Sequence, residues 1–153
     1  MQIATFEFQT THSSIGYLYS QLDILLIRIA EATKELTNSK LAIANYKNKC
    51  KKFNKNITKF KHYLIDTHKF DFSSFEKYWV EIENFKKIRN YLVHQNGISI
   101  TDTKFIEYIN SNPNLKIEND VLIVSKDYLI EISDKIKEFL FKIMERLFEE
   151  AKK

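Results

Sequence analysis

The chain has 153 residues, enough for one domain with a hydrophobic core and too few for two domains of ordinary size. Only two glycines and one proline interrupt it, so the composition favours long helices over a turn-rich β-protein. The single cysteine excludes an internal disulfide and is typical of a reducing compartment. Because no long apolar run or signal-peptide pattern is seen, we expect a cytoplasmic protein without a membrane span.

The net charge of +4 hides an uneven distribution. Residues 36–65 contain eight of the basic residues and none of the 20 acidic ones, which leaves 16 basic residues elsewhere. A basic surface of this kind is expected where a protein binds a polyanion such as RNA, although a solvated lysine face would have the same composition. The lysines that we single out as RNA contacts are Lys51, Lys52, Lys55 and Lys59, together with Lys86 and Lys87.

The first half of the chain predicts two helices. Within residues 1–12, Phe6 and Phe8 alternate with polar neighbours, which fits an extended arm or a short strand. A helix is expected from Ser13 or Ser14 to Asn38, and a second from Ser39 to about Leu64, where apolar residues recur every three or four positions. On this second apolar seam, four residues are interpreted as core rather than as stacking or reactive groups: Tyr46, Cys50, Phe53 and Phe60.

The second half predicts two further long helices and an insertion between them. A third helix is expected over residues 74–95, a short one over 101–111, and a hairpin over 115–124. Ser125 then caps a last helix whose wide apolar face suggests burial on two sides, including by a partner subunit. The fold class is therefore all-α, a four-to-five-helix antiparallel bundle with a small β-hairpin insertion before the last helix, in one domain over 1–153.

Three polar residues stand at the end of the otherwise core-forming third helix. Arg89 continues the seven-residue series of Phe75 and Ile82, where the pattern expects an apolar side chain. An unpaired buried guanidinium costs roughly several kcal/mol, so Arg89 must meet an anion, a carboxylate or water. Asn90 and His94 lie one turn apart on a shared face, and the following Gly97 is expected to stop the helix.

Arginine, an amide and a histidine are the groups needed for metal-free cleavage of RNA, in which the ribose 2′-hydroxyl attacks the adjacent phosphate. We assign proton transfer to His94, binding of the phosphate and transition state to Arg89, and orientation of substrate or of His94 to Asn90. One histidine per chain favours a two-fold dimer with both motifs near the axis. In the alternative, Arg89 pairs with a carboxylate of a neighbouring helix and His94 caps the helix end.

No metal or other cofactor is expected. His62, Asp66 and His68 are residue types that bind metals, but their spacing does not place two histidines four residues apart with an acid between them. A metal-dependent enzyme is therefore the least favoured function.

The run from Ile88 to Gly97 resembles the signature of HEPN domains, small helical proteins whose motif is Arg, four to six residues, then His. The resemblance implies a dimeric, metal-independent ribonuclease, often a toxin or defence component, with two motifs meeting across the interface and an antitoxin or regulatory protein as a possible partner. Some members carry Tyr two residues after the His, where this chain has Asn96. Domains of this kind that only bind nucleotide, nucleic acid or a partner protein are the alternative.

Overall fold

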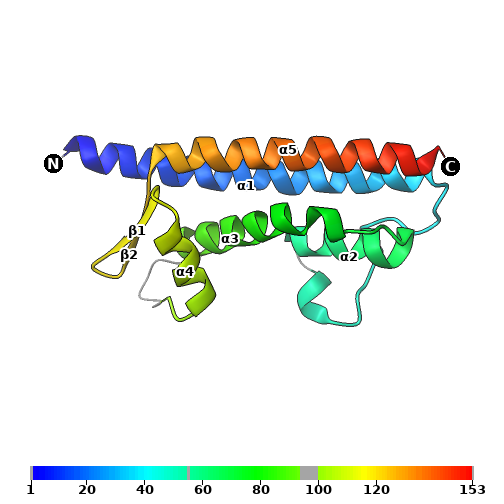
Figure 1. The fold of residues 1–153 in the computed structure, drawn as a ribbon, viewed down its shortest axis with the longest axis horizontal. Coiled ribbons are helices and arrows are strands. Elements are labelled where there is room, and N and C mark those ends of the chain that lie inside the picture. The colour runs from blue at the N-terminus through cyan, green and yellow to red at the C-terminus, as the bar shows by residue number, and fades with distance from the viewer. Residues whose placement is uncertain (1, 55, 94–99, 153) are drawn as a thin grey trace. The chain divides into compact units, whose positions relative to one another are not determined.

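A computed structural model describes residues 2–54, 56–93 and 100–152 of the chain (Figure 1). Helices make up 73% of it and a two-stranded hairpin precedes the last helix, so the predicted all-α class with a hairpin insertion is confirmed. The elements in chain order are α1 (Gln2–Leu36), η1 (Lys51–Asn54), α2 (Asn56–His68), η2 (Ser73–Phe75), α3 (Glu76–Val93), α4 (Thr103–Ser111), β1 (Leu115–Glu118), β2 (Val121–Val124) and α5 (Lys126–Ala151).

The chain divides into two compact units, and the division falls within α1, α3 and α5. The first unit joins Met1–Tyr19 to Tyr78–Ile136, and the second joins Ser20–Lys77 to Lys137–Lys153. Each unit contains its own set of buried apolar side chains.

In the first unit, a polar cluster fixes α3, α4 and α5 to one another. Glu81 of α3 accepts hydrogen bonds from the Tyr108 hydroxyl of α4 and from the Lys135 ammonium of α5, both at 3.0 Å. Lys135 also forms an ion pair with Glu131 at 2.6 Å. Burial alone would lower the pKa of Lys135, but its hydrogen bonds to these two carboxylates raise it. The cluster therefore holds polar groups of three helices in a single arrangement.

The insertion between α3 and α5 follows its sequence signals closely. Asp102 caps α4 by accepting a hydrogen bond from the Phe105 backbone N–H at 3.2 Å. The antiparallel strands β1 and β2 pair Glu118 with Val121, and both residues of the Asn119-Asp120 turn have positive φ angles. Asparagine and aspartate tolerate that backbone region better than most residues.

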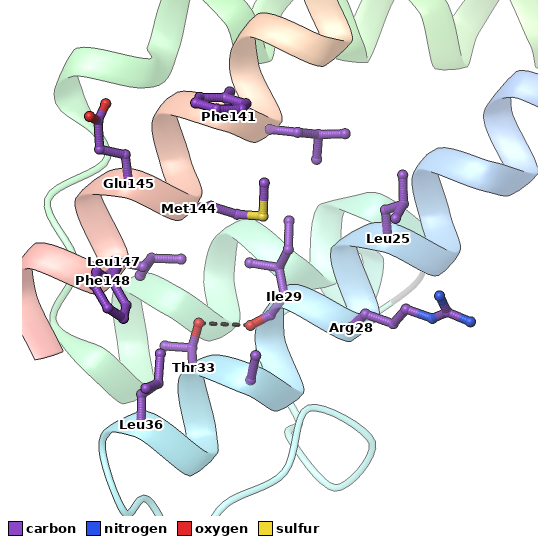
Figure 2. Close-up of a pocket in the computed structure, with 12 residues that line it drawn as sticks. Leu25, Arg28, Ile29, Thr33, Leu36, Phe141, Met144, Glu145, Leu147 and Phe148 are labelled. Atoms are coloured by element: carbon purple, nitrogen blue, oxygen red, sulfur yellow. Dashed lines mark hydrogen bonds between the residues drawn. The ribbon is translucent and has the colours of Figure 1, made fainter.

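The second unit contains the C-terminal half of α1 beside the C-terminal half of α5, and these two segments run in the same direction (Figures 1 and 2). An aromatic cluster forms its core, with ring centroids 5.7–6.4 Å apart. The members of this cluster are Phe70, Phe72, Phe75 and Phe139.

The N-terminal arm was predicted wrongly. Residues 2–12 belong to α1, which continues without a break to Leu36. The first turn of α1 has no acidic residue, so the usual signal of a helix start is absent there, whereas the serines at 13 and 14 imitate one.

The predicted second helix is wrong over its first half, because α2 begins only at Asn56. The Asn48 side chain accepts a hydrogen bond from the Cys50 backbone N–H at 2.8 Å, a local turn that competes with helix formation. Tyr46 remains buried as predicted and donates a hydrogen bond to Asp66. Cys50 is exposed, so its assignment to the core was wrong.

Candidate functional site

The candidate site is centred on Arg89, which lies on α3 in the first unit and is half-buried. Its guanidinium carbon lies 5.2 Å from the centre of the Tyr19 ring of α1. A cation over the face of an aromatic ring is stabilised by the negative charge density of that face. Tyr19 in turn packs against Phe85 of α3, with ring centroids 6.1 Å apart. The arginine is thus held by an aromatic surface built from two helices.

Asn90, the next residue, contributes the second contact. Its side-chain oxygen accepts a hydrogen bond from one terminal nitrogen of Arg89 at 3.1 Å. Nε of Arg89 is buried and has no hydrogen-bond partner among the residues that the structure describes. The side chains of Arg89 and Asn90 are therefore in direct contact.

The alternative in which Arg89 pairs with a carboxylate is not observed among the described residues. Within residues 2–54, 56–93 and 100–152, no acidic side chain forms an ion pair with Arg89. Two acids of the same unit have lysine partners, since Glu81 binds Lys135 and Asp102 binds Lys87 at 2.7 Å. The positive charge of Arg89 is stabilised by a ring and an amide, neither of which neutralises it.

His94, the third predicted member, lies outside the described residues, and so does Lys55. His94 follows Arg89 by five positions in the sequence, and α3 is described to Val93. The role assigned to His94 therefore stays a prediction from the sequence.

The predicted RNA-binding lysines fall into two groups. Lys86 and Lys87 belong to the first unit with Arg89, but Lys87 is already engaged by Asp102 and by the Phe105 ring, whose centre lies 5.6 Å from Nζ. The other three predicted lysines that the structure describes belong to the second unit. Lys51 and Lys52 are exposed on η1, and Lys59 donates a hydrogen bond to the Ala44 carbonyl at 3.2 Å.

Sequence reasoning missed the contribution of α1. His12 and Tyr19 are seven residues apart, which places them on the same face of α1 about two turns from each other. Burial lowers the pKa of His12, so its imidazole is neutral at pH 7. The seven-residue spacing of His12 and Tyr19 is visible in the sequence, but it indicates a shared helix face only if the helix starts before residue 12.

Among the described residues, no group of three or more histidine, cysteine, aspartate or glutamate side chains is placed to hold a metal ion. None of the helices described is both long enough and apolar enough to cross a membrane.

Comparisons with models of known protein families, with curated proteins and with solved structures give no significant match.

Proposed function

We propose that this chain is a cytoplasmic, metal-independent endoribonuclease of the toxin or defence type, with a composite active site between two copies. The observation that supports this most directly is the state of Arg89. A half-buried guanidinium that is held in position yet has no carboxylate partner among the described residues is suited to bind a phosphate group.

In the proposed reaction, the ribose 2′-oxygen forms a bond to the adjacent phosphorus and the bond from phosphorus to the 5′-oxygen breaks. One His94 takes the 2′-hydroxyl proton, and the second copy's His94 gives a proton to the leaving 5′-oxygen. The products are a 2′,3′-cyclic phosphate and a 5′-hydroxyl. Arg89 stabilises the negative charge that accumulates on the phosphorane-like transition state, and Asn90 orients the substrate or His94.

The fixed position of Arg89 matters for this role. A guanidinium that is already oriented by Tyr19 and Asn90 loses little side-chain entropy when the phosphate binds. Tyr19 is a positioning residue in this scheme because it acts through Arg89 and does not touch the RNA.

The test is cleavage of a labelled single-stranded RNA by the purified protein in excess chelator. Arg89→Ala and His94→Ala are expected to lower the cleavage rate about 100- to 1,000-fold, the usual loss when one group that stabilises a transition state is removed. Arg146→Ala is the matched control, because Arg146 is an exposed arginine paired with Glu150 on α5. Cleavage should leave cyclic phosphate ends.

Tyr19 gives a second measure of the same site. Tyr19→Leu is expected to slow cleavage about 2- to 30-fold, the equivalent of one cation–π contact, whereas Tyr19→Phe keeps the ring and the rate. Full activity of Arg89→Ala would contradict the proposal. Tight RNA binding that depends on Arg89, without cleavage by the wild-type protein, would instead support a non-catalytic HEPN-like domain.

A further inference from the structure

The second unit has a large apolar pocket between α1 and α5 (Figure 2). Its volume is about 680 Å³, the size of a ligand or side-chain docking site. Of the twelve residues that line it, nine are aliphatic, aromatic or methionine side chains. All twelve lining residues belong to the second unit, whereas Arg89 and Asn90 belong to the first.

Large apolar side chains around this pocket face solvent. Phe141 is 71% exposed, Phe148 52% and Met144 46%, all three on α5. Leu36 of α1 is 47% exposed on the other side of the pocket. Single exposed apolar residues are common, but several of them around one concave surface mark a site that another molecule covers.

Two charges of opposite sign flank the pocket. Arg28 comes from α1 and Glu145 from α5, and Figure 2 shows them extending away from each other on opposite sides of the apolar lining. Neither forms an ion pair with any other residue in the described part of the chain. A two-fold rotation about an axis through the pocket exchanges these opposite sides, so that Arg28 of one copy comes to lie against Glu145 of the other.

We propose that this face pairs two copies of the chain, with the apolar pockets buried against each other and two symmetric ion pairs between Arg28 and Glu145. This face belongs to the second unit and Arg89 to the first, so the pairing is proposed independently of the proposed function.

A second copy fits the charges better than other occupants do. An anionic amphiphile would satisfy Arg28 but would bring its negative charge into a pocket that Glu145 also lines, and a cationic partner would meet the reverse problem. A second copy supplies both signs at the required positions by symmetry, and the exposed aromatic residues are of the type that dominates such interfaces.

The test is the molar mass of the purified full chain in solution, without RNA, for a set of charge reversals. Arg28→Glu places two glutamates opposite each other at both ion-pair positions, and Glu145→Arg places two arginines there. Each variant alone is expected to raise the dissociation constant of the dimer about a hundredfold. An equimolar mixture of the two variants restores both attractive pairs, and so does the double variant R28E/E145R.

Lys142→Glu is the matched control, since Lys142 is on α5, does not line the pocket and pairs with Glu138 of the same helix. This variant should stay dimeric, and Phe141→Ser should dissociate while keeping the wild-type helical circular dichroism. A monomeric wild-type chain at micromolar concentration would overturn the proposal. Dimers that resist both charge reversals, or single variants that dissociate but do not recombine when mixed, would overturn it as well. RNA cleavage is measured separately, so failure of the pairing and failure of the nuclease function are distinguishable.

Discussion

Arg89 occupies a position where helical periodicity calls for an apolar side chain, and the structure shows how that position is accommodated. The aromatic ring of Tyr19 takes the place of an apolar neighbour while it also stabilises the charge. The departure of Arg89 from the pattern could be read from the sequence. Its partner could not, because Tyr19 is 70 residues away and periodicity within one helix carries no information about which helix packs against it.

His68 makes the stability of the fold depend on pH. It ends α2, its Nδ1 lies 3.2 Å from the Thr37 hydroxyl, and its ring packs edge-on against Tyr63. Burial lowers the pKa of His68 below 6.5, so the unfolded chain binds this proton more readily than the folded chain does. The stabilisation that the neutral His68 ring gives to the folded state is complete above pH 6.5. It is lost as the pH falls from 6.5 towards the lowered pKa.

We therefore expect the melting temperature of the wild-type protein to fall between about pH 7.5 and pH 5.5, and to fall less in a His68→Asn variant. Asparagine keeps a polar atom near Thr37 but does not titrate. Burial also lowers the pKa of His12, so His12 accounts for part of the dependence of melting temperature on pH that remains in the variant. Equal slopes in the two proteins would show that His68 is not linked to folding.

Among the elements, those with local start or turn signals were predicted well, whereas the apolar spacing of residues 39–50 predicted a helix that the structure does not have. The Asn119-Asp120 turn and the cap of α4 are recognised from a few adjacent residues. Residues 39–50 have a helical spacing of apolar side chains, yet Ile43 and Tyr46 are buried by an irregular segment that hydrogen bonds hold in place. One of these bonds runs from the Tyr63 hydroxyl to the Leu41 carbonyl. A pattern of burial does not specify the backbone that produces it.

The start of α5 offers a test of a local signal. The Ser125 hydroxyl accepts a hydrogen bond from the Tyr128 backbone N–H at 3.2 Å, which satisfies one of the free donors of the first turn. Ser125→Ala should lower the free energy of unfolding by about 1 kcal/mol, and Ser125→Asp should retain it because a carboxylate caps equally well. Urea unfolding followed by circular dichroism measures both. An unchanged midpoint for the alanine variant would mean that this bond does not stabilise the helix.

For the whole molecule, the uneven distribution of charge predicts how the proposed RNA binding would respond to salt. Each phosphate that a lysine neutralises releases condensed counterions, so the affinity for a single strand falls with salt with a slope of about 0.7 per contact. Lys51 and Lys52 are exposed on η1 in the segment without acidic residues. Lys116 and Lys142 lie outside this segment and form ion pairs with Glu118 and Glu138.

Two double variants of equal net charge separate a specific basic surface from a general effect of charge. K51Q/K52Q should reduce the slope of log affinity against log salt by about 1.4, whereas K116Q/K142Q should leave it nearly unchanged. Binding of a labelled RNA to cleavage-deficient His94→Ala protein over a range of salt concentrations gives both slopes. If the two variants behave alike, the lysines of residues 36–65 are a solvated face, and RNA recognition by this chain would have to depend on the surface around Arg89 alone.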